Sequence, residues 1–335
     1  MRESMSERDR RVSIPEAMRS EAAHEPDPRP RGSIDWSKVH DHGTDAPPTL
    51  IEDIVEIKSM PKRDDGLPNF AEHDEDTKNH PIETPIAPPV NFRRYLGRLL
   101  EDRSTGPDAL RIIDVGCGRG DTVAWLCAQG WDAYGIDISP EYIQRGREYL
   151  ARQGASPERL QLLNDDTTYP FPDGMFDVVL SDQVIEHVAD LELFASEVAR
   201  ISAPGACGLH NFPAKWRPVE THLLSPFVHW LPKGPLRRAA VAGALWIGLA
   251  APYFKEFPFS DRVEIFSRFS EEETFYRSLR STIATMQRHG LRCDARLASQ
   301  DKIAMRLPTA PKAALPLLGW LYRHMSNTAL QTHKP

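Results

Sequence analysis

The chain has 335 residues, of which 40% are hydrophobic and 27% charged, and its formal net charge at pH 7 is −7. This length suits one large domain or two small ones, and the net negative charge argues against a strongly basic surface for nucleic acid. The four cysteines form no CxxC or Cys/His spacing and the N-terminus lacks an apolar signal region, so we expect a cytoplasmic protein with reduced thiols.

Residues 1–88 are rich in proline and contain only two aromatic residues, Trp36 and Phe70. Such a segment buries too little apolar surface to offset the entropy lost on ordering. We therefore expect a largely disordered N-terminal extension with one short helix near residues 50–57, followed by a single domain over residues 89–335.

The domain begins with apolar residues at helical spacing over residues 91–100. Short apolar runs then alternate with helical segments: strands are predicted at 110–115, 131–138, 160–164, 175–181 and 206–212, and helices at 120–129, 140–153 and 190–201. This alternation predicts an α/β, Rossmann-like, doubly wound and mostly parallel seven-stranded sheet with helices on both faces. Ligands of such sheets bind at the carboxyl ends of the strands.

After residue 212 we expect an irregular, aromatic-rich insertion over residues 213–268, which would be a lid. A helix at 271–289, a strand at 291–298, a C-terminal helix and a last strand near 328–332 follow. Residues 239–254 lack any charge, but the run is shorter than the roughly 20 residues that span a bilayer. A buried or lid helix is expected there, with peripheral membrane contact as the alternative.

A glycine-rich turn, Asp114–Asp121, joins the first strand to the next helix. Glycines let the backbone approach a ligand, and the helix N-terminus favours an anion, so a dinucleotide or S-adenosylmethionine would fit. The GxGxG spacing and the carboxylate of Asp114, which would repel a pyrophosphate, favour S-adenosylmethionine. Asp137 ends the second strand, where it can accept both ribose hydroxyls, and Asp165 or Asp166 can accept from the adenine amino group.

The segments IIDVGCGRGD, GIDIS, NDDTTYPFPDGMFDVVLSDQVIEHV and SEVARISAPGACGLHNFP resemble, in this order, the motifs of class I S-adenosylmethionine-dependent methyltransferases. Quinone-precursor and other small-molecule O-methyltransferases are among the similar families, and the resemblance covers about residues 91–212. It implies that S-adenosylmethionine is the cofactor. The predicted cofactor-binding residues are Asp114, Gly116, Cys117, Gly118, Asp137, Ile138, Asp165, Asp166 and Ser181.

The candidate catalytic residues are Glu186 and His187, after the fourth strand, and His222 in the insertion. His187 would be a general base for a hydroxyl acceptor, because its unperturbed pKa lies near neutrality. A structural role for the Glu-His pair is the alternative. Some similar families hold a divalent metal with a Glu-x-x-Glu-His phrase, but Gln183 stands at its first position here, and no metal is predicted.

The sequence thus predicts methyl transfer to the hydroxyl of a small molecule or glycan, with nucleic acid an unlikely partner and no oligomeric state indicated. The tryptophans and histidines of residues 212–232 suit a sugar or another polyhydroxylated ring. Two alternatives are a non-catalytic S-adenosylmethionine-binding partner subunit and a nicotinamide-dependent oxidoreductase.

Overall fold

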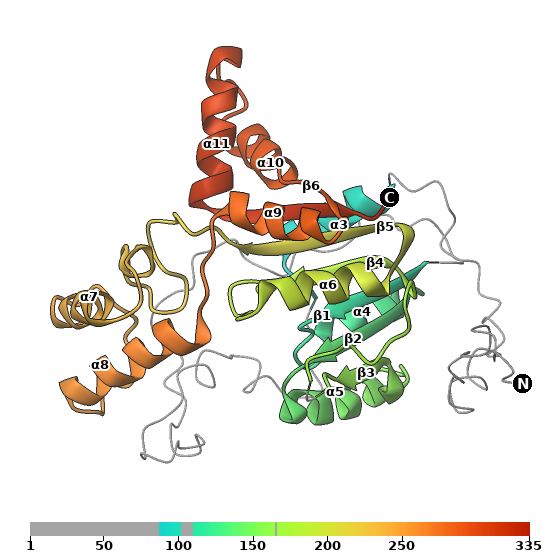
Figure 1. The fold of residues 1–335 in the computed structure, drawn as a ribbon, viewed down its shortest axis with the longest axis horizontal. Helices are drawn as coiled ribbons and strands as arrows, with labels where there is room; N and C mark the ends of the chain where they lie inside the picture. Colours follow the sequence, from blue (N-terminus) through green and yellow to red (C-terminus); the bar gives the residue numbers. More distant parts are fainter. Residues whose placement is uncertain (1–86, 102–109, 165) are drawn as a thin grey trace, which may run out of the picture. The chain divides into compact units, whose positions relative to one another are not determined.

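The computed structural model describes residues 87–101, 110–164 and 166–335, all within the larger of the chain's two units, residues 35–335. The helix predicted at 50–57 and nearly all of the predicted N-terminal extension lie outside the described residues. Seven strands form one sheet in the order β3-β2-β1-β4-β5-β7-β6 (Figure 1). They are β1 (Arg111–Val115), β2 (Asp132–Asp137), β3 (Leu160–Leu162), β4 (Phe176–Asp182), β5 (Ser202–Pro213), β6 (Arg292–Asp294) and β7 (Asn327–His333).

Strands β1 to β5 pair in parallel, whereas β7 is antiparallel to both β5 and β6. The strand order reverses between β1 and β4, which is where open α/β sheets bind their ligands. The prediction of a Rossmann-like, mostly parallel seven-stranded sheet is therefore confirmed.

Helices cover both faces of the sheet, and neighbouring residues of one strand enter different cores. Ile112 packs with α3 (Val90–Glu101), α4 (Asp121–Ala128) and α5 (Pro140–Arg152), whereas Ile113 packs with α6 (Leu191–Ile201) and α9 (Leu279–Arg288). Strands buried on both faces need continuous apolar runs rather than alternation, which is what β1 and β4 have in sequence.

Local signals account for two of these helices. The hydroxyl of Ser139 accepts the backbone N–H of Tyr142 at the start of α5, where Pro140 occupies the first turn. The carboxylate of Asp190 accepts the N–H of Leu193 at the start of α6. Capping residues of this kind satisfy backbone donors that have no partner inside the helix.

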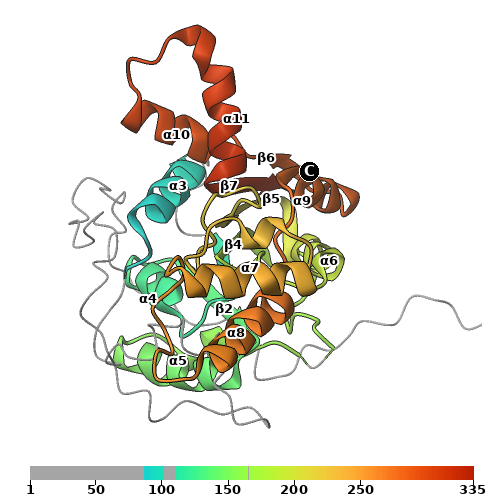
Figure 2. The same cartoon turned by 90° about the vertical axis from the view of Figure 1, so that its left-hand side faces the viewer.

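The segment between β5 and α9 is less irregular than expected, because it contains two helices, the first of which overlaps the helix expected within residues 239–254. Helices α7 (Pro235–Trp246) and α8 (Phe259–Arg268) enclose a small core of their own that includes Phe254 and Phe266. Figures 1 and 2 place both helices on the side of the sheet at which β4 and β5 end. Among the described residues, no helix is long and apolar enough to cross a membrane.

Two other boundaries differ from those predicted. Helix α9 begins at Leu279 rather than near 271, because Phe269–Glu273 form a π-turn and the Ser278 hydroxyl caps the following helix. Strand β5 begins at Ser202, although Pro204-Gly205 was expected to separate helix from strand; the pairing with β4 shifts register there, and Gly205 takes a φ of 80°. A bulge thus absorbs the two residues without ending the strand.

The C-terminal part differs as well. Strand β6 has only three residues, because α10 (Leu297–Arg306) starts where the strand was predicted to end. A further helix, α11 (Leu315–Met325), leads into β7, whose predicted position is confirmed. Short 3-10 turns lie at Pro157–Arg159, Val228–Trp230 and Lys312–Ala314.

Gly146 tests how tightly α5 packs on the loop after β1. An alanine Cβ there would lie 2.6 Å from the Arg119 carbonyl oxygen and 2.7 Å from a Leu160 methyl. We expect Gly146→Ala to lower the free energy of unfolding by about 1–3 kcal/mol, as overpacking does. Gly243→Ala in α7 is the matched control: nothing lies within 4 Å of its Cβ, and it should raise stability by about 0.5–1 kcal/mol. Urea unfolding measures both, and equal effects would contradict the packing shown.

Candidate active site

The loop after β1 is fixed between two neighbouring strand ends. The backbone N–H groups of Gly116 and Cys117 both donate to the Ile136 carbonyl of β2, at 2.8 and 3.0 Å. Gly116 has a φ of 76°, and a Cβ there would lie 2.4 Å from a Val184 methyl. Only glycine combines this conformation with this approach, so the loop after β1 packs directly on the loop after β4.

Asp137, at the end of β2, orders the same loop. Its two carboxylate oxygens accept the N–H groups of Gly118, at 2.8 Å, and Ser139, at 2.9 Å. Each oxygen keeps a second lone pair, so the carboxylate can still accept a ligand hydroxyl. The neighbouring Ile138 is 73% exposed and Leu162, at the end of β3, is 37% exposed. The carboxylate thus adjoins exposed apolar side chains.

Three carboxyl groups meet at the ends of β1, β2 and β4. Burial, followed by the charge of Asp182, raises the pKa of Asp114 to about 8. Burial also raises the pKa of Asp137 and of Asp182. A cationic ligand would offset this repulsion and the lost hydration. The sequence-based reasoning missed Asp182, although a polar residue that ends a buried parallel strand is a usable signal.

The structure does not bring every predicted cofactor residue to this point. The Cys117 thiol is buried, and the Ser181 hydroxyl lies 2.8 Å from Nδ1 of His210 inside the sheet. The Asp166 carboxylate accepts the N–H and hydroxyl of Thr168 in an exposed turn. Asp165 lies outside the described residues. The cofactor roles of these four residues stay predictions, as do those of the other predicted cofactor-binding residues.

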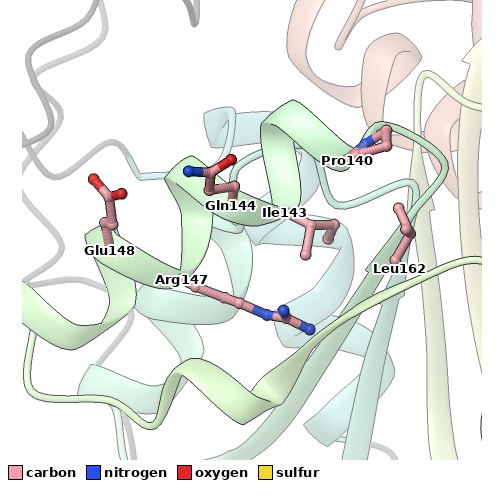
Figure 3. A pocket seen from close by; sticks show the side chains of 6 residues that line it. All are labelled: Pro140, Ile143, Gln144, Arg147, Glu148 and Leu162. Atoms are coloured by element: carbon pink, nitrogen blue, oxygen red, sulfur yellow. The ribbon is translucent and has the colours of Figure 1, made fainter.

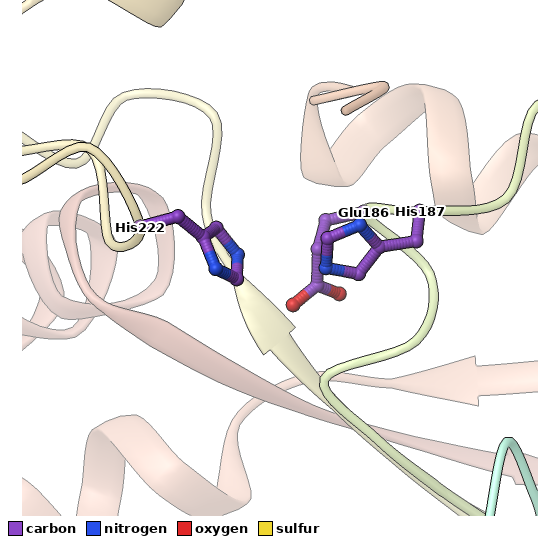
Figure 4. A group of neighbouring side chains, drawn as sticks. All are labelled: Glu186, His187 and His222. Carbon is purple, nitrogen blue, oxygen red and sulfur yellow. The ribbon is translucent and has the colours of Figure 1, made fainter. Parts of the chain in front are cut away.

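The three candidate catalytic residues come together (Figure 4). One donor atom from each of Glu186, His187 and His222 lies within 4.8 Å of those of the other two. The two imidazole rings are 5.0 Å apart at an angle of 69°. Gln183 makes the sharp turn that leads from β4 to Glu186: its φ is 56°, and its N–H donates to the Asn211 carbonyl at 2.8 Å.

Glu186 and His187 differ in their surroundings. Glu186 is 2% exposed, neither carboxylate oxygen has a hydrogen-bond partner among the described residues, and burial raises its pKa to about 8. His187 is exposed, and its Nδ1 lies 2.8 Å from the Glu273 carbonyl oxygen. Because a carbonyl only accepts, Nδ1 carries the proton, and the lone pair of the neutral ring is on Nε2.

Glu220 and His229, which share the aromatic-rich segment with His222, have supporting positions. The buried Glu220 carboxylate accepts the N–H of Leu223 and the hydroxyl of Tyr276, and so fixes the turn that carries His222. His229 is buried beside the Tyr276 ring, and burial lowers its pKa to about 4, so the imidazole is neutral.

A separate depression lies on α5, lined by Pro140, Ile143, Gln144, Arg147, Glu148 and Leu162 (Figure 3). Arg147 donates to the Leu160 carbonyl there. None of the predicted site residues lines it, but Leu162, which pairs with Asp137, does, so the depression borders the strand-end site.

Part of the chain is similar in sequence to a known protein family. Residues 113–208 match the family model of a methyltransferase domain. Probable tocopherol O-methyltransferase of Oryza sativa subsp. japonica is 43% identical over 96 residues, which cover 28% of this chain and 26% of that protein. Norajmaline N-methyltransferase of Rauvolfia serpentina is 36% identical over 109 residues, which cover 32% and 37%.

The chain therefore spans only about a quarter to about a third of the length of these relatives. Among solved structures, geranyl diphosphate C-methyltransferase from Streptomyces coelicolor A3(2) is 14% identical with a TM-score of 0.42, over 72% of this chain and 80% of that one. The matched segment contains the loop after β1, Asp137 and the Glu186-His187 pair. Together with the sheet and its acidic strand ends, the match shows that the chain carries a class I S-adenosylmethionine-dependent methyltransferase domain.

Proposed function

We propose that this chain transfers the sulfonium methyl group of S-adenosylmethionine to a hydroxyl of a small molecule. One observation carries the proposal: the carboxyl groups at the ends of β1, β2 and β4 are linked to the cluster of Glu186, His187 and His222 through Asp182, whose charge acts on both Asp114 and Glu186. A cationic cofactor suits the first group, and a hydroxyl acceptor suits the second.

The residues at the strand ends match the parts of the cofactor. Asp137 would accept the ribose hydroxyls, and Asp114 would face the ammonium group. The open space beside Gly118, where a Cβ would meet no atom within 4 Å, would admit the methionine part. The exposed Ile138 would cover one face of the adenine.

The sulfonium methyl is already activated, so the protein has to position the acceptor, exclude water and remove one proton. Nε2 of His187 carries the lone pair that would take the hydroxyl proton. The S–C bond then breaks as the O–C bond forms, and S-adenosylhomocysteine leaves as a neutral thioether.

The surroundings of His222 favour an apolar acceptor over a glycan. Leu224, Phe227 and Val219 on the same segment are 38%, 50% and 41% exposed. One relative is named as a probable tocopherol O-methyltransferase, and two others are named as N-methyltransferases of norajmaline and ajmaline. Transfer from labelled S-adenosylmethionine to tocopherols, to norajmaline and to a glycan mixture would separate these classes. We expect label on the hydroxyl compounds; transfer to the amine alone would contradict the hydroxyl assignment.

Asp137→Ala tests the cofactor site. Loss of charge-assisted hydrogen bonds costs about 1.5–3 kcal/mol, so affinity for S-adenosylhomocysteine should fall at least about tenfold by calorimetry. Asp132→Ala, at the opposite end of the same strand, should leave it unchanged. NADH should not bind the wild-type chain. Unchanged affinity in Asp137→Ala would remove this carboxylate from the site.

The pKa of Asp114 predicts a pH dependence. Burial and the charge of Asp182 raise this pKa to about 8, so the free protein is protonated there at neutral pH. An ammonium group selects the carboxylate, so binding releases a proton. Affinity for S-adenosylhomocysteine should rise by up to about tenfold per pH unit below pH 8 and level off above it. In Asp114→Asn, binding should be weaker and nearly independent of pH over this range.

Peripheral membrane contact at residues 239–254 is a further part of the proposal. Trp246, Ile247 and Leu249, where α7 ends, are 80%, 59% and 51% exposed, and aromatic and aliphatic side chains of this kind enter lipid interfaces. The full chain should float with phosphatidylcholine vesicles, and Trp246→Ser should reduce the floating fraction. A wild-type chain that stays with the soluble fraction would contradict this contact.

A further inference from the structure

The cluster of Glu186, His187 and His222 has a donor set beyond the needs of a general base. It joins one carboxylate and two imidazoles from two separate segments, the loop after β4 and the turn before Leu223. In Figure 4 the Glu186 carboxylate and both rings are directed toward a common point. A single proton acceptor would require only one of these side chains.

Glu186 supplies the first observation that points to a ligand. Its side chain is 2% exposed, and neither carboxylate oxygen has a hydrogen-bond partner among the described residues. Buried polar groups are almost always partnered, and a buried carboxylate is usually paired with a cation or bound to a metal. No lysine or arginine forms a salt bridge with Glu186 in the part of the chain that the structure describes.

His187 supplies the second. Its Nδ1–H donates to the Glu273 carbonyl at 2.8 Å, which fixes the ring and leaves the Nε2 lone pair as the donor. Metal-binding histidines are usually oriented by such a bond from the other ring nitrogen. The main chain of Glu186 is held as well, because its carbonyl accepts the N–H of Phe275 at 2.6 Å.

His222 is held from the other side. The Glu220 carboxylate accepts both the Leu223 N–H and the Tyr276 hydroxyl, so the turn at His222 is tied to the same stretch of chain that positions His187. The Phe269 ring packs 5.3 Å from the His222 ring and 6.3 Å from the His187 ring. The side chains of the cluster are therefore held in place by residues around them.

We propose that Glu186, His187 and His222 form a binding site for one divalent first-row transition metal ion, such as Zn²⁺ or Co²⁺. Two imidazoles and one carboxylate suit such ions, whereas Mg²⁺ prefers oxygen donors throughout. Three protein donors leave positions open for another ligand. This site departs from the sequence-based expectation that no metal is used, which rested on Gln183 and did not foresee that His222 joins the pair.

The role of the ion rests on the function proposed above. One carboxylate and two neutral imidazoles leave a divalent ion with a net charge of +1, which would bind the acceptor oxygen and lower the pKa of its hydroxyl. That proton would pass to water, the methyl would move from sulfur to oxygen, and the cofactor would leave as the thioether. With the ion bound, Nε2 of His187 is a ligand, and its general-base role applies to the metal-free protein.

Metal binding by the full, tag-free chain tests the site without any acceptor. After dialysis against a chelator, we expect Zn²⁺ to bind at one ion per chain by calorimetry, and Co²⁺ to give absorption bands of an ion bound through nitrogen. His187→Ala, His222→Ala and Glu186→Gln should each weaken binding at least about tenfold, since even partners outside the ligand set change metal affinity 10–100-fold. His324→Ala, at a half-buried histidine on α11, is the matched control and should bind as the wild type does.

Circular dichroism and S-adenosylhomocysteine affinity would show that each variant folds. Sub-stoichiometric Zn²⁺ binding, or wild-type affinity in Glu186→Gln and His222→Ala, would overturn the metal site. Full methyl transfer in the presence of chelator would also overturn it while leaving the proposed function intact. Conversely, Zn²⁺ binding that is lost in the three variants, in a chain that binds no S-adenosylhomocysteine, would support the site and refute the function.

Discussion

The packing of Gly116 against Val184 is the contact on which both the predicted cofactor site and the cluster of Glu186, His187 and His222 depend. Gly116 belongs to the loop after β1 and Val184 to the loop after β4, and a Cβ at Gly116 would lie 2.4 Å from the valine methyl. Because β1 and β4 are neighbours at the reversal of strand order, these loops meet over the sheet edge. The absence of one side chain thus lets the loop that follows Asp114 pack on the loop that leads to Glu186, and the charge of Asp182 acts on both of these carboxyl groups. Transfer of a group between two ligands requires that their sites be close.

The same region is electrostatically unfavourable in the unliganded protein. Asp114, Asp182 and Glu186 are poorly hydrated, and burial is the main cause of the raised pKa of each. Elsewhere in the chain, buried or half-buried acids have partners: Glu197 binds Arg200, and Asp301 binds two arginines of α3. Perturbed and unpaired acids gather at functional sites because ligands complete them. The scaffold acids Glu197 and Asp301 are thus paired with arginines, whereas no salt bridge among the described residues holds Asp114, Asp182 or Glu186, and this contrast marks the site.

How much could be predicted from the sequence depends on whether the signal is local. Strands β1 and β4 and helices α5 and α6 have continuous apolar runs or capping residues, and they were placed within a few residues. The start of α9 was misplaced because the π-turn at Phe269–Glu273 depends on packing against the loop after β4, where Phe275 donates to Glu186. Asp114, Gly116 and Asp137 could be proposed from the sequence because each lies at or just after the end of a strand. The sequence could not show that His222 joins the cluster while Glu220 and His229 have supporting positions. Both supporting residues contact Tyr276, which is distant in sequence and has no recognisable local pattern.

The two halves of the site are built by different parts of the chain. The cofactor half uses only parallel strands and their loops, and it lies within the segment that matches the methyltransferase family, residues 113–208. The acceptor half needs Glu186 and His187 from that segment, but also His222 and the supporting Glu220–Tyr276 pair, which lie beyond it. We therefore expect this chain to share its cofactor site with relatives named as O- or N-methyltransferases, and its choice of acceptor to depend on the segment from β5 to α9. The buried Glu220–Tyr276 hydrogen bond is the physical link through which that segment positions a side chain against the shared half.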